Sequence, residues 1–213
     1  MTIHHSNQNQ ELFKKASTEL EMLRLHGSIT VKNSNNSSSS SSINKDGIPF
    51  PNACLHILRS IIPGNLRCID CGNSHPDWAS VSYGILLCVR CSGRHRSYGV
   101  ATSRVRSISM DNWSYSQVLS MLEGGNEQLH NFYSRHLMCD IKSEIFDRRY
   151  QTKAAYFYRT NMEVHVANVG KFGQWKGREA SRKVVTIHRQ CDKRKGSTNS
   201  HNAKVVMIAS AAA

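Results

Sequence analysis

Apolar side chains recur at regular spacing through the middle of the chain, from about residue 49 to 165. Between Leu55 and Ile62 they return every three or four residues, which predicts a helix that begins near Pro51-Asn52 and ends at Pro63-Gly64. From 81 to 87 every second residue is apolar, which predicts a strand. The middle of the chain therefore contains both helices and strands.

Two more helices are predicted farther along. Apolar residues from 118 to 122 lie on one helical face and are followed by the stop signal Gly124-Gly125. The apolar face continues from Leu129 to Leu137, which predicts the second of these helices. Because a short sheet alone buries little surface, we expect these helices to supply the hydrophobic core.

The first 48 residues are expected to be mostly disordered. Leu12, Ala16, Leu20 and Leu23 recur at helical spacing, which predicts a short amphipathic helix. Such a helix would fray in isolation or dock on a partner. Residues 33–46 are almost entirely Asn and Ser, which is typical of a flexible linker.

Positive charge is concentrated after the middle segment. The chain carries a formal net charge of +13, and residues 171–213 contain ten Lys or Arg against Glu179 and Asp192. We therefore interpret 166–213 as a basic, disordered tail, which is either simply solvated, attracted to anionic membrane surfaces or, as a third alternative, bound to nucleic acid. The middle segment is only modestly basic, which disfavours nucleic acid as its partner.

Four of the seven cysteines form two C-x-x-C pairs with sixteen residues between the pairs. They are Cys68, Cys71, Cys88 and Cys91. Two such pairs at this spacing are typical of a tetrahedral zinc site, in which each thiolate lies about 2.3 Å from the ion. The sequence therefore predicts one structural Zn²⁺.

A disulfide framework is the alternative use of these cysteines. The count is odd, and Cys54, Cys139 and Cys191 lie far apart in the sequence. The first residues lack a signal-peptide pattern, and no apolar stretch reaches the 18 or so residues of a membrane span. We therefore expect no transmembrane segment, a reducing cytoplasmic compartment, and Cys54 and Cys139 as small buried side chains.

The strand, the second cysteine pair and a helix that opens at Cys91 predict a treble-clef-like finger. The fold class is thus α+β, a small zinc finger with four cysteine ligands and a short β-sheet, surrounded by α-helices. Arg96 lies about 140° around the helix from Cys91, so it points outward if the Cys91 sulfur faces the metal. His75 and His95 are expected at the surface or behind the cysteine ligands.

The order of several short motifs adds a family resemblance. They include Cys68-Ile69-Asp70-Cys71-Gly72, Pro76-Asp77-Trp78-Ala79-Ser80, Cys88-Val89-Arg90-Cys91-Ser92-Gly93, His95-Arg96, Ser103-Arg104-Val105-Arg106-Ser107 and Asp111-Asn112-Trp113. From about Cys54 to Tyr158 the chain closely resembles the ArfGAP domain of GTPase-activating proteins that act on ADP-ribosylation-factor (Arf) small GTPases. We therefore predict an ArfGAP-like zinc domain over 49–165.

The resemblance implies that Arg96 is an arginine finger, inserted in trans into the nucleotide site of an Arf-family GTPase in its GTP form. It also implies a role in vesicle trafficking. Because the sequence contains no phosphate-cradling glycine loop, we expect no nucleotide site on this chain. The protein is then expected in the cytoplasm, peripheral at Golgi, endosomal or plasma membranes. Five residues are predicted to bind the partner, with core packing as the alternative for both tryptophans: Trp78, Ile85, Leu86, Arg104 and Trp113.

Two other function classes stay open at this point. A scaffold with the same fold would bind the GTPase without accelerating hydrolysis, although the intact Arg96 disfavours it. A nucleic-acid-binding zinc finger would fit the overall basic charge, and its binding would weaken as salt rises.

Overall fold

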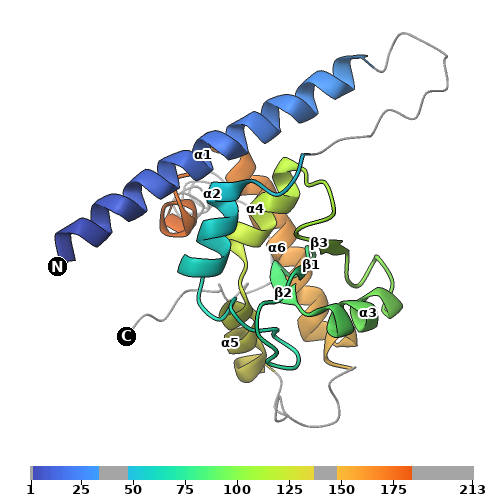
Figure 1. Cartoon of the computed structure of the whole chain (residues 1–213). Helices are drawn as coiled ribbons and strands as arrows, with labels where there is room; N and C mark the ends of the chain where they lie inside the picture. The colour runs from blue at the N-terminus through green and yellow to red at the C-terminus, as the bar shows by residue number, and fades with distance from the viewer. Residues whose placement is uncertain (1, 34–47, 137–147, 184–213) are drawn as a thin grey trace, which may run out of the picture.

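The computed structural model describes residues 2–33, 48–136 and 148–183. Three short strands form one antiparallel sheet in the order β2-β1-β3: β1 (Trp78–Ser80), β2 (Ile85–Leu87) and β3 (Val105–Ser107). Trp78 pairs with Leu87 on one side and with Ser107 on the other. The sheet lies at the centre of the domain, with helices around it (Figure 1).

The strand predicted over 81–87 is shorter than expected. Gly84 adopts a φ of +63°, and a Cβ at this position would lie 2.5 Å from the backbone oxygen of Ser120. The Gly84 carbonyl also accepts a hydrogen bond from the Gly125 N–H at 2.8 Å. The chain therefore turns tightly against the neighbouring helix before β2 begins, which leaves only three residues in the strand.

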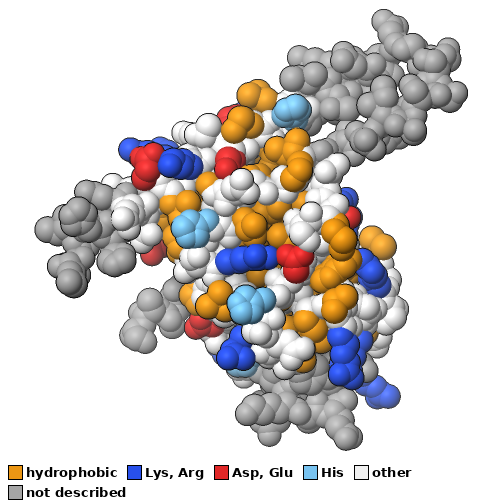
Figure 2. All heavy atoms as spheres, viewed as in Figure 1, with side chains coloured by type: hydrophobic (Ala, Val, Ile, Leu, Met, Phe, Trp, Pro, Cys, Tyr) orange, Lys and Arg blue, Asp and Glu red, His pale blue; other side chains and the backbone are white. Residues whose placement is uncertain are grey.

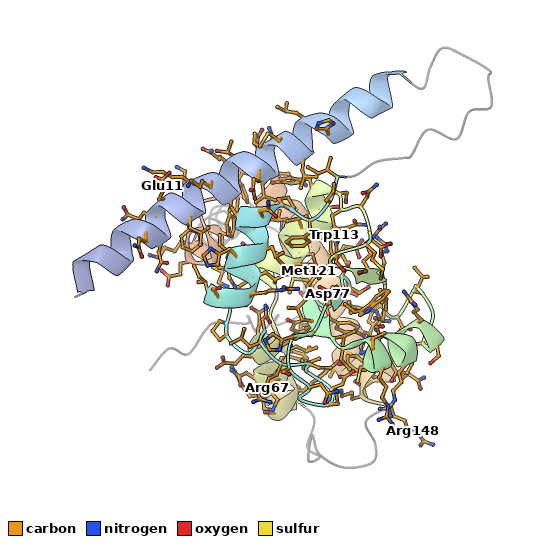
Figure 3. The ribbon with its side chains drawn as sticks, viewed as in Figure 1. Glu11, Arg67, Asp77, Trp113, Met121 and Arg148 are labelled. Carbon is orange, nitrogen blue, oxygen red and sulfur yellow. The ribbon has the colours of Figure 1, made fainter. Side chains whose placement is uncertain are left out.

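The helices predicted around the sheet are confirmed. Helix α2 (Asn52–His56) continues as a π-helical turn (Ile57–Ile61) that ends before Pro63-Gly64. Helix α4 (Tyr115–Glu123) stops at the two glycines and is followed by α5 (Asn126–His136). Their inward faces are apolar, and Trp113 and Met121 point into the interior between α2 and the sheet (Figure 3).

The N-terminal helix is much longer than the spacing of its apolar residues predicts. Helix α1 (Thr2–Asn33) lies across α2 and α4 (Figure 1) and buries Leu20 and Leu23 in the shared core. The Glu19 carboxylate accepts hydrogen bonds from the backbone N–H groups of Ala53 at 2.9 Å and Cys54 at 3.1 Å. The interpretation of this helix as short and fraying is wrong, because α2 and α4 cover its apolar face. The Glu19 carboxylate also caps the N-terminus of α2. The Asn- and Ser-rich linker lies outside the described residues.

The predicted disorder of 166–213 is also wrong for its first part. Helix α6 (Lys153–Lys171) extends beyond residue 165, and residues 178–183 are helical. Trp175 is buried, stacks obliquely on Phe13 with ring centroids 5.9 Å apart, and donates a hydrogen bond from Nε1 to Glu123 at 2.7 Å. The buried indole fixes this stretch against α1 and α4, whereas residues 184–213 lie outside the described part.

The surface charge and the helix hydrophobicity of the described residues are relevant to binding of nucleic acid and of membranes. Basic side chains on the face shown in Figure 2 are scattered among hydrophobic, acidic and polar ones, without one large basic patch. No helix within 2–33, 48–136 or 148–183 is long and apolar enough to cross a membrane.

Candidate metal centre and arginine site

The four predicted ligands meet at one point. The sulfur atoms of Cys68, Cys71, Cys88 and Cys91 all lie within 4.8 Å of one another, and the Cys71 and Cys88 sulfurs are 3.5 Å apart. Four thiolates around a tetrahedral ion at about 2.3 Å would be spaced about 3.8 Å apart. The donor set and its geometry therefore fit a single tetrahedral metal ion with four sulfur ligands.

Local backbone structure turns the sulfurs toward this point. In the first knuckle the Gly72 N–H donates to the Cys68 carbonyl at 2.9 Å, and Gly72 has a φ of +75°, which favours glycine. In the second knuckle Cys88 is the N-cap of helix α3 (Val89–Ser97), and its sulfur accepts a weak hydrogen bond from the Cys91 N–H at 3.5 Å. The first turn of α3 is thus part of the metal centre.

Burial governs the ionisation of the cysteine cluster. It raises the pKa of the Cys68 thiol to about 11 and also raises the pKa of the Cys91 thiol. At Cys88 burial acts in the same direction, but hydrogen bonds from the Cys91 N–H and the Cys71 thiol outweigh it and lower the pKa. Because four adjacent thiolates repel one another, a divalent cation between them is the group that this cluster is built to hold.

Arg96 lies on the opposite face of α3 from the buried sulfur of Cys91 and is exposed, as the helical geometry predicts. Its guanidinium carbon lies over the ring of Trp78, 4.4 Å from the ring centroid. Trp78 comes from β1 and is partly buried. The stacked indole limits the directions that the long arginine side chain can take.

A buried polar network that no pattern in the sequence predicts lies behind α3. His95 is fully buried and bonds with both ring nitrogens, through Nε2 to Asp70 at 3.1 Å and through Nδ1 to the Ser103 hydroxyl at 2.7 Å. The Ser103 hydroxyl in turn bonds the Ser80 hydroxyl at 2.6 Å. His95 is thus a residue behind the cysteine ligands, whereas His75 is exposed.

Asp70 is the acidic member of this network. Burial opposes its ionisation, but the hydrogen bond with His95 and the positive charge of Arg149 outweigh burial, so the pKa of Asp70 lies below its ordinary value. The carboxylate also accepts hydrogen bonds from Arg149 and, at 2.8 Å, from the Tyr150 hydroxyl. The only sequence signal for this network is that Asp70 and His95 lie inside or close to the two cysteine motifs, since its other members come from distant segments.

Three residues predicted to bind the partner are in the core instead. Ile85 and Leu86 are fully buried, because β2 has neighbours on both faces, and the Leu86 N–H donates to the Asn126 side chain at 2.7 Å. The interpretation of Ile85 and Leu86 as an outward-facing surface is therefore wrong. Trp113 is also fully buried and donates from Nε1 to the Ser107 carbonyl at 3.0 Å, so the core-packing alternative holds for it.

The other two predicted partner residues remain at the surface. Arg104 is exposed on the loop before β3, and Trp78 is partly exposed beside Arg96. The structure thus leaves Arg96, Trp78 and Arg104 accessible to a partner.

The segment that holds the four clustered cysteines and Arg96 matches a known family. A model of the ArfGap family, described as "Putative GTPase activating protein for Arf", matches residues 52–166, more than half of the chain. The chain belongs to the ArfGap family. The matched residues include the four clustered cysteines and Arg96, so the metal centre and the arginine site are parts of the ArfGAP domain.

Similar proteins include ADP-ribosylation factor GTPase-activating protein 3 of Mus musculus, which is 44% identical over 107 residues. Arf-GAP with coiled-coil, ANK repeat and PH domain-containing protein 2 of Gallus gallus is 47% identical over 76 residues. These matches cover 50% and 36% of this chain, but only 20% and 10% of the two relatives. The chain thus spans at most a fifth of the length of these two relatives.

Among solved structures, the chain is similar to one described as a "putative GTPase activating protein for ADP ribosylation factor" from Cryptosporidium parvum. The two are 27% identical with a TM-score of 0.49, and the match covers 53% of this chain and 88% of that chain.

Proposed function

We propose that this protein is a GTPase-activating protein for Arf-family small GTPases and that Arg96 is its arginine finger. The observation that carries the proposal is the exposed Arg96 on a helix whose first turn carries two of the four clustered cysteines, within a domain of the ArfGap family. The names of the similar proteins support the same activity.

The chemistry of GTP hydrolysis explains what an exposed arginine contributes. As water attacks the γ-phosphate, negative charge spreads over the phosphate oxygens, and a guanidinium placed against them stabilises that charge. An arginine supplied in trans is worth about 10³ to 10⁵ in rate. Lysine lacks the planar fork that meets two oxygens at once, so it would replace Arg96 poorly.

In this proposal the partner provides the rest of the reaction. The GTP, the magnesium ion and the residue that orients the attacking water belong to the Arf-type GTPase in its GTP form. Arg96 enters the partner's site, while Trp78 and Arg104 contact the surrounding surface. This chain needs no nucleotide site of its own, and it acts as an activator of another protein's hydrolysis.

The metal in this proposal is one structural Zn²⁺. Cys68, Cys71, Cys88 and Cys91 would hold it, and four sulfur ligands complete the tetrahedral coordination that structural zinc prefers. When bound, the ion supplies cross-linking and charge neutralisation and takes no direct part in hydrolysis. Cys88 is the N-cap of α3 and Cys91 lies in its first turn, so these two ligands define where the helix begins.

The cellular setting follows from the partner. Arf-family GTPases act in vesicle trafficking, so we propose that this protein works in the cytoplasm, at the surface of Golgi, endosomal or plasma membranes. The basic residues of 166–213 would add attraction to anionic lipid headgroups, worth about 1 kcal/mol for each Lys or Arg near the surface.

A GTP-hydrolysis assay tests the proposed function. The purified protein is added to several purified Arf-type GTPases loaded with GTP, on vesicles of phosphatidylcholine alone and of phosphatidylcholine with phosphatidylserine. We expect faster phosphate release from at least one GTPase, and more so on the anionic vesicles. Tight binding to the GTP form without acceleration would contradict the proposal and identify a scaffold. Binding to DNA or RNA that weakens as salt rises, with neither faster hydrolysis nor binding to the GTPase, would identify a nucleic-acid-binding finger.

A further inference from the structure

Helix α3 has two separate attachments, one at each end. Its first turn contains the cysteines of the second knuckle, but Arg96 lies near its other end, five residues after Cys91. At 1.5 Å per residue this separation is about 7.5 Å along the helix axis. A metal held at one end fixes where a helix starts, but a second contact is needed to fix the direction in which it runs.

His95 makes this second contact, one residue before Arg96. Its ring is fully buried and is held from two sides, by the carboxylate of Asp70 and by the hydroxyl of Ser103. Because a carboxylate only accepts hydrogen bonds, Nε2 donates to Asp70, and Nδ1 bonds the Ser103 hydroxyl. The ring also contacts Tyr150 at 4.3 Å between centroids, so neither its position nor its rotation is free.

The same contacts connect α3 with the strand that carries Trp78. Ser80 is two residues after Trp78 in β1, so both side chains lie on the same face of the sheet. Trp78 stacks on Arg96, and Ser80 bonds the hydroxyl of Ser103. Strand β1 therefore contacts both the functional arginine and the network that holds the neighbouring histidine.

The far side of the network is anchored in the C-terminal part of the domain. Asp70 is buried and is paired with Arg149, which is itself buried, and with the Tyr150 hydroxyl. A buried carboxylate that is paired in this way keeps a fixed position, because leaving its partners would expose an uncompensated charge to the apolar interior. His95 is thus attached to a rigid acceptor and not to a mobile side chain.

We propose that His95, held between Asp70 and Ser103, is a positioning residue that sets the direction of α3 and thereby aims Arg96. This inference rests on the proposed function, because it assumes that Arg96 acts on the partner's nucleotide. Because the side chains of Asp70, His95 and Ser103 are buried, the network acts through the placement of Arg96 and not through a contact with the partner.

Three variants test the proposal. Ser103→Ala removes one hydrogen bond to His95 and leaves the ring in place, and His95→Gln keeps a polar group in the same space. Ser97→Ala is the matched control on the same helix, because Ser97 is exposed and its hydroxyl bonds within α3, to the Arg94 carbonyl at 2.7 Å. Zinc content and thermal unfolding are measured for each, so that loss of fold is recognised.

The first readout separates kcat from KM in the GTP-hydrolysis assay. A misplacement of a catalytic group by about 1 Å can cost about 10²-fold in rate. We expect Ser103→Ala and His95→Gln to lower kcat by about tenfold or more, with KM unchanged within about twofold. A variant that merely loosened the partner-binding surface would raise KM instead, and that result would overturn the proposal.

The second readout does not depend on activity. The Nε–Hε resonance of Arg96, assigned by its absence in Arg96→Lys, is expected upfield because of the Trp78 ring current. Ser103→Ala and His95→Gln should move it toward the position of a free arginine, and Ser97→Ala should not. The proposal would be overturned if Ser103→Ala and His95→Gln gave the same kcat as Ser97→Ala, or the same Arg96 resonance.

The two hypotheses can fail separately. If the wild type does not accelerate hydrolysis by any Arf-type GTPase tested, the proposed function fails. The arginine resonance alone then decides whether the network positions Arg96.

Discussion

The guanidinium carbon of Arg96 lies 4.4 Å from the centroid of the Trp78 ring. This contact connects the last turn of α3 with β1 of the sheet. Arg96 is exposed and Trp78 is only partly buried, so the pair lies at the surface of the domain. In such a stack the flat face of the guanidinium packs on the ring, and the N–H groups in its plane can still donate hydrogen bonds to a partner. The arrangement therefore presents a partly ordered cation to a partner.

Removal of the indole should weaken the proposed activity without unfolding the domain. A cation–π contact at an exposed site is worth about 0.5–1 kcal/mol, so Trp78→Ala should lower kcat by about two- to fivefold. Trp78→Phe keeps an aromatic face and should retain more activity. Steady-state GTP hydrolysis with an Arf-type GTPase measures both, and equal activity of Trp78→Ala and the wild type would show that the stack has no role.

Helix α1 should stabilise the domain to which it is bound. Leu20 is 1% exposed, so Leu20→Ala should lower the free energy of unfolding by about 2–5 kcal/mol. Met22 lies on the same helix but is 49% exposed, and Met22→Ala should change the free energy by less than about 0.5 kcal/mol. Urea unfolding followed by circular dichroism compares the two, and similar small effects would mean that α1 is not part of the folded unit.

Metal removal should unfold the knuckles and the start of α3. Binding of structural zinc contributes about 10–16 kcal/mol in small zinc domains, which is comparable to or larger than a domain's net stability. A strong chelator should therefore reduce the far-ultraviolet circular dichroism signal, and added Zn²⁺ should restore it.

Cys54 provides the control for this experiment. It is fully buried next to α1 but does not belong to the cysteine cluster. Cys54→Ala should bind one equivalent of zinc like the wild type, whereas Cys88→Ala should not. A circular dichroism spectrum that stays unchanged in excess chelator would contradict the structural role of the metal.

The sequence predicted the parts of the site that depend on local spacing. The spacing of two residues within each cysteine pair determines the geometry of a knuckle. The spacing of five residues from Cys91 to Arg96 determines how far around α3 the arginine lies. For that reason the cysteine cluster and the outward direction of Arg96 are confirmed. The helices around the sheet were also predicted, because their apolar residues and glycine stops are close together in the chain.

The parts that depend on distant contacts were missed or mistaken. The His95 network joins residues from five separate segments, and no spacing in the sequence brings Asp70, Ser103 and Arg149 together. The apolar face of α1 was recognised, but the surface that covers it belongs to α2 and α4. Ile85 and Leu86 were misplaced because alternation alone does not reveal that β2 is covered on both faces.

Arg96 is proposed to accelerate hydrolysis of the GTP that another protein binds. The most direct test is the kcat/KM for GTP hydrolysis by a lipid-bound Arf-type GTPase, measured with wild type, Arg96→Ala and Arg96→Lys after each has been shown to bind one zinc and to unfold at the same temperature. We expect both variants to lose acceleration by about 10³-fold or more. Stimulation by Arg96→Ala equal to that of the wild type would show that Arg96 is not an arginine finger.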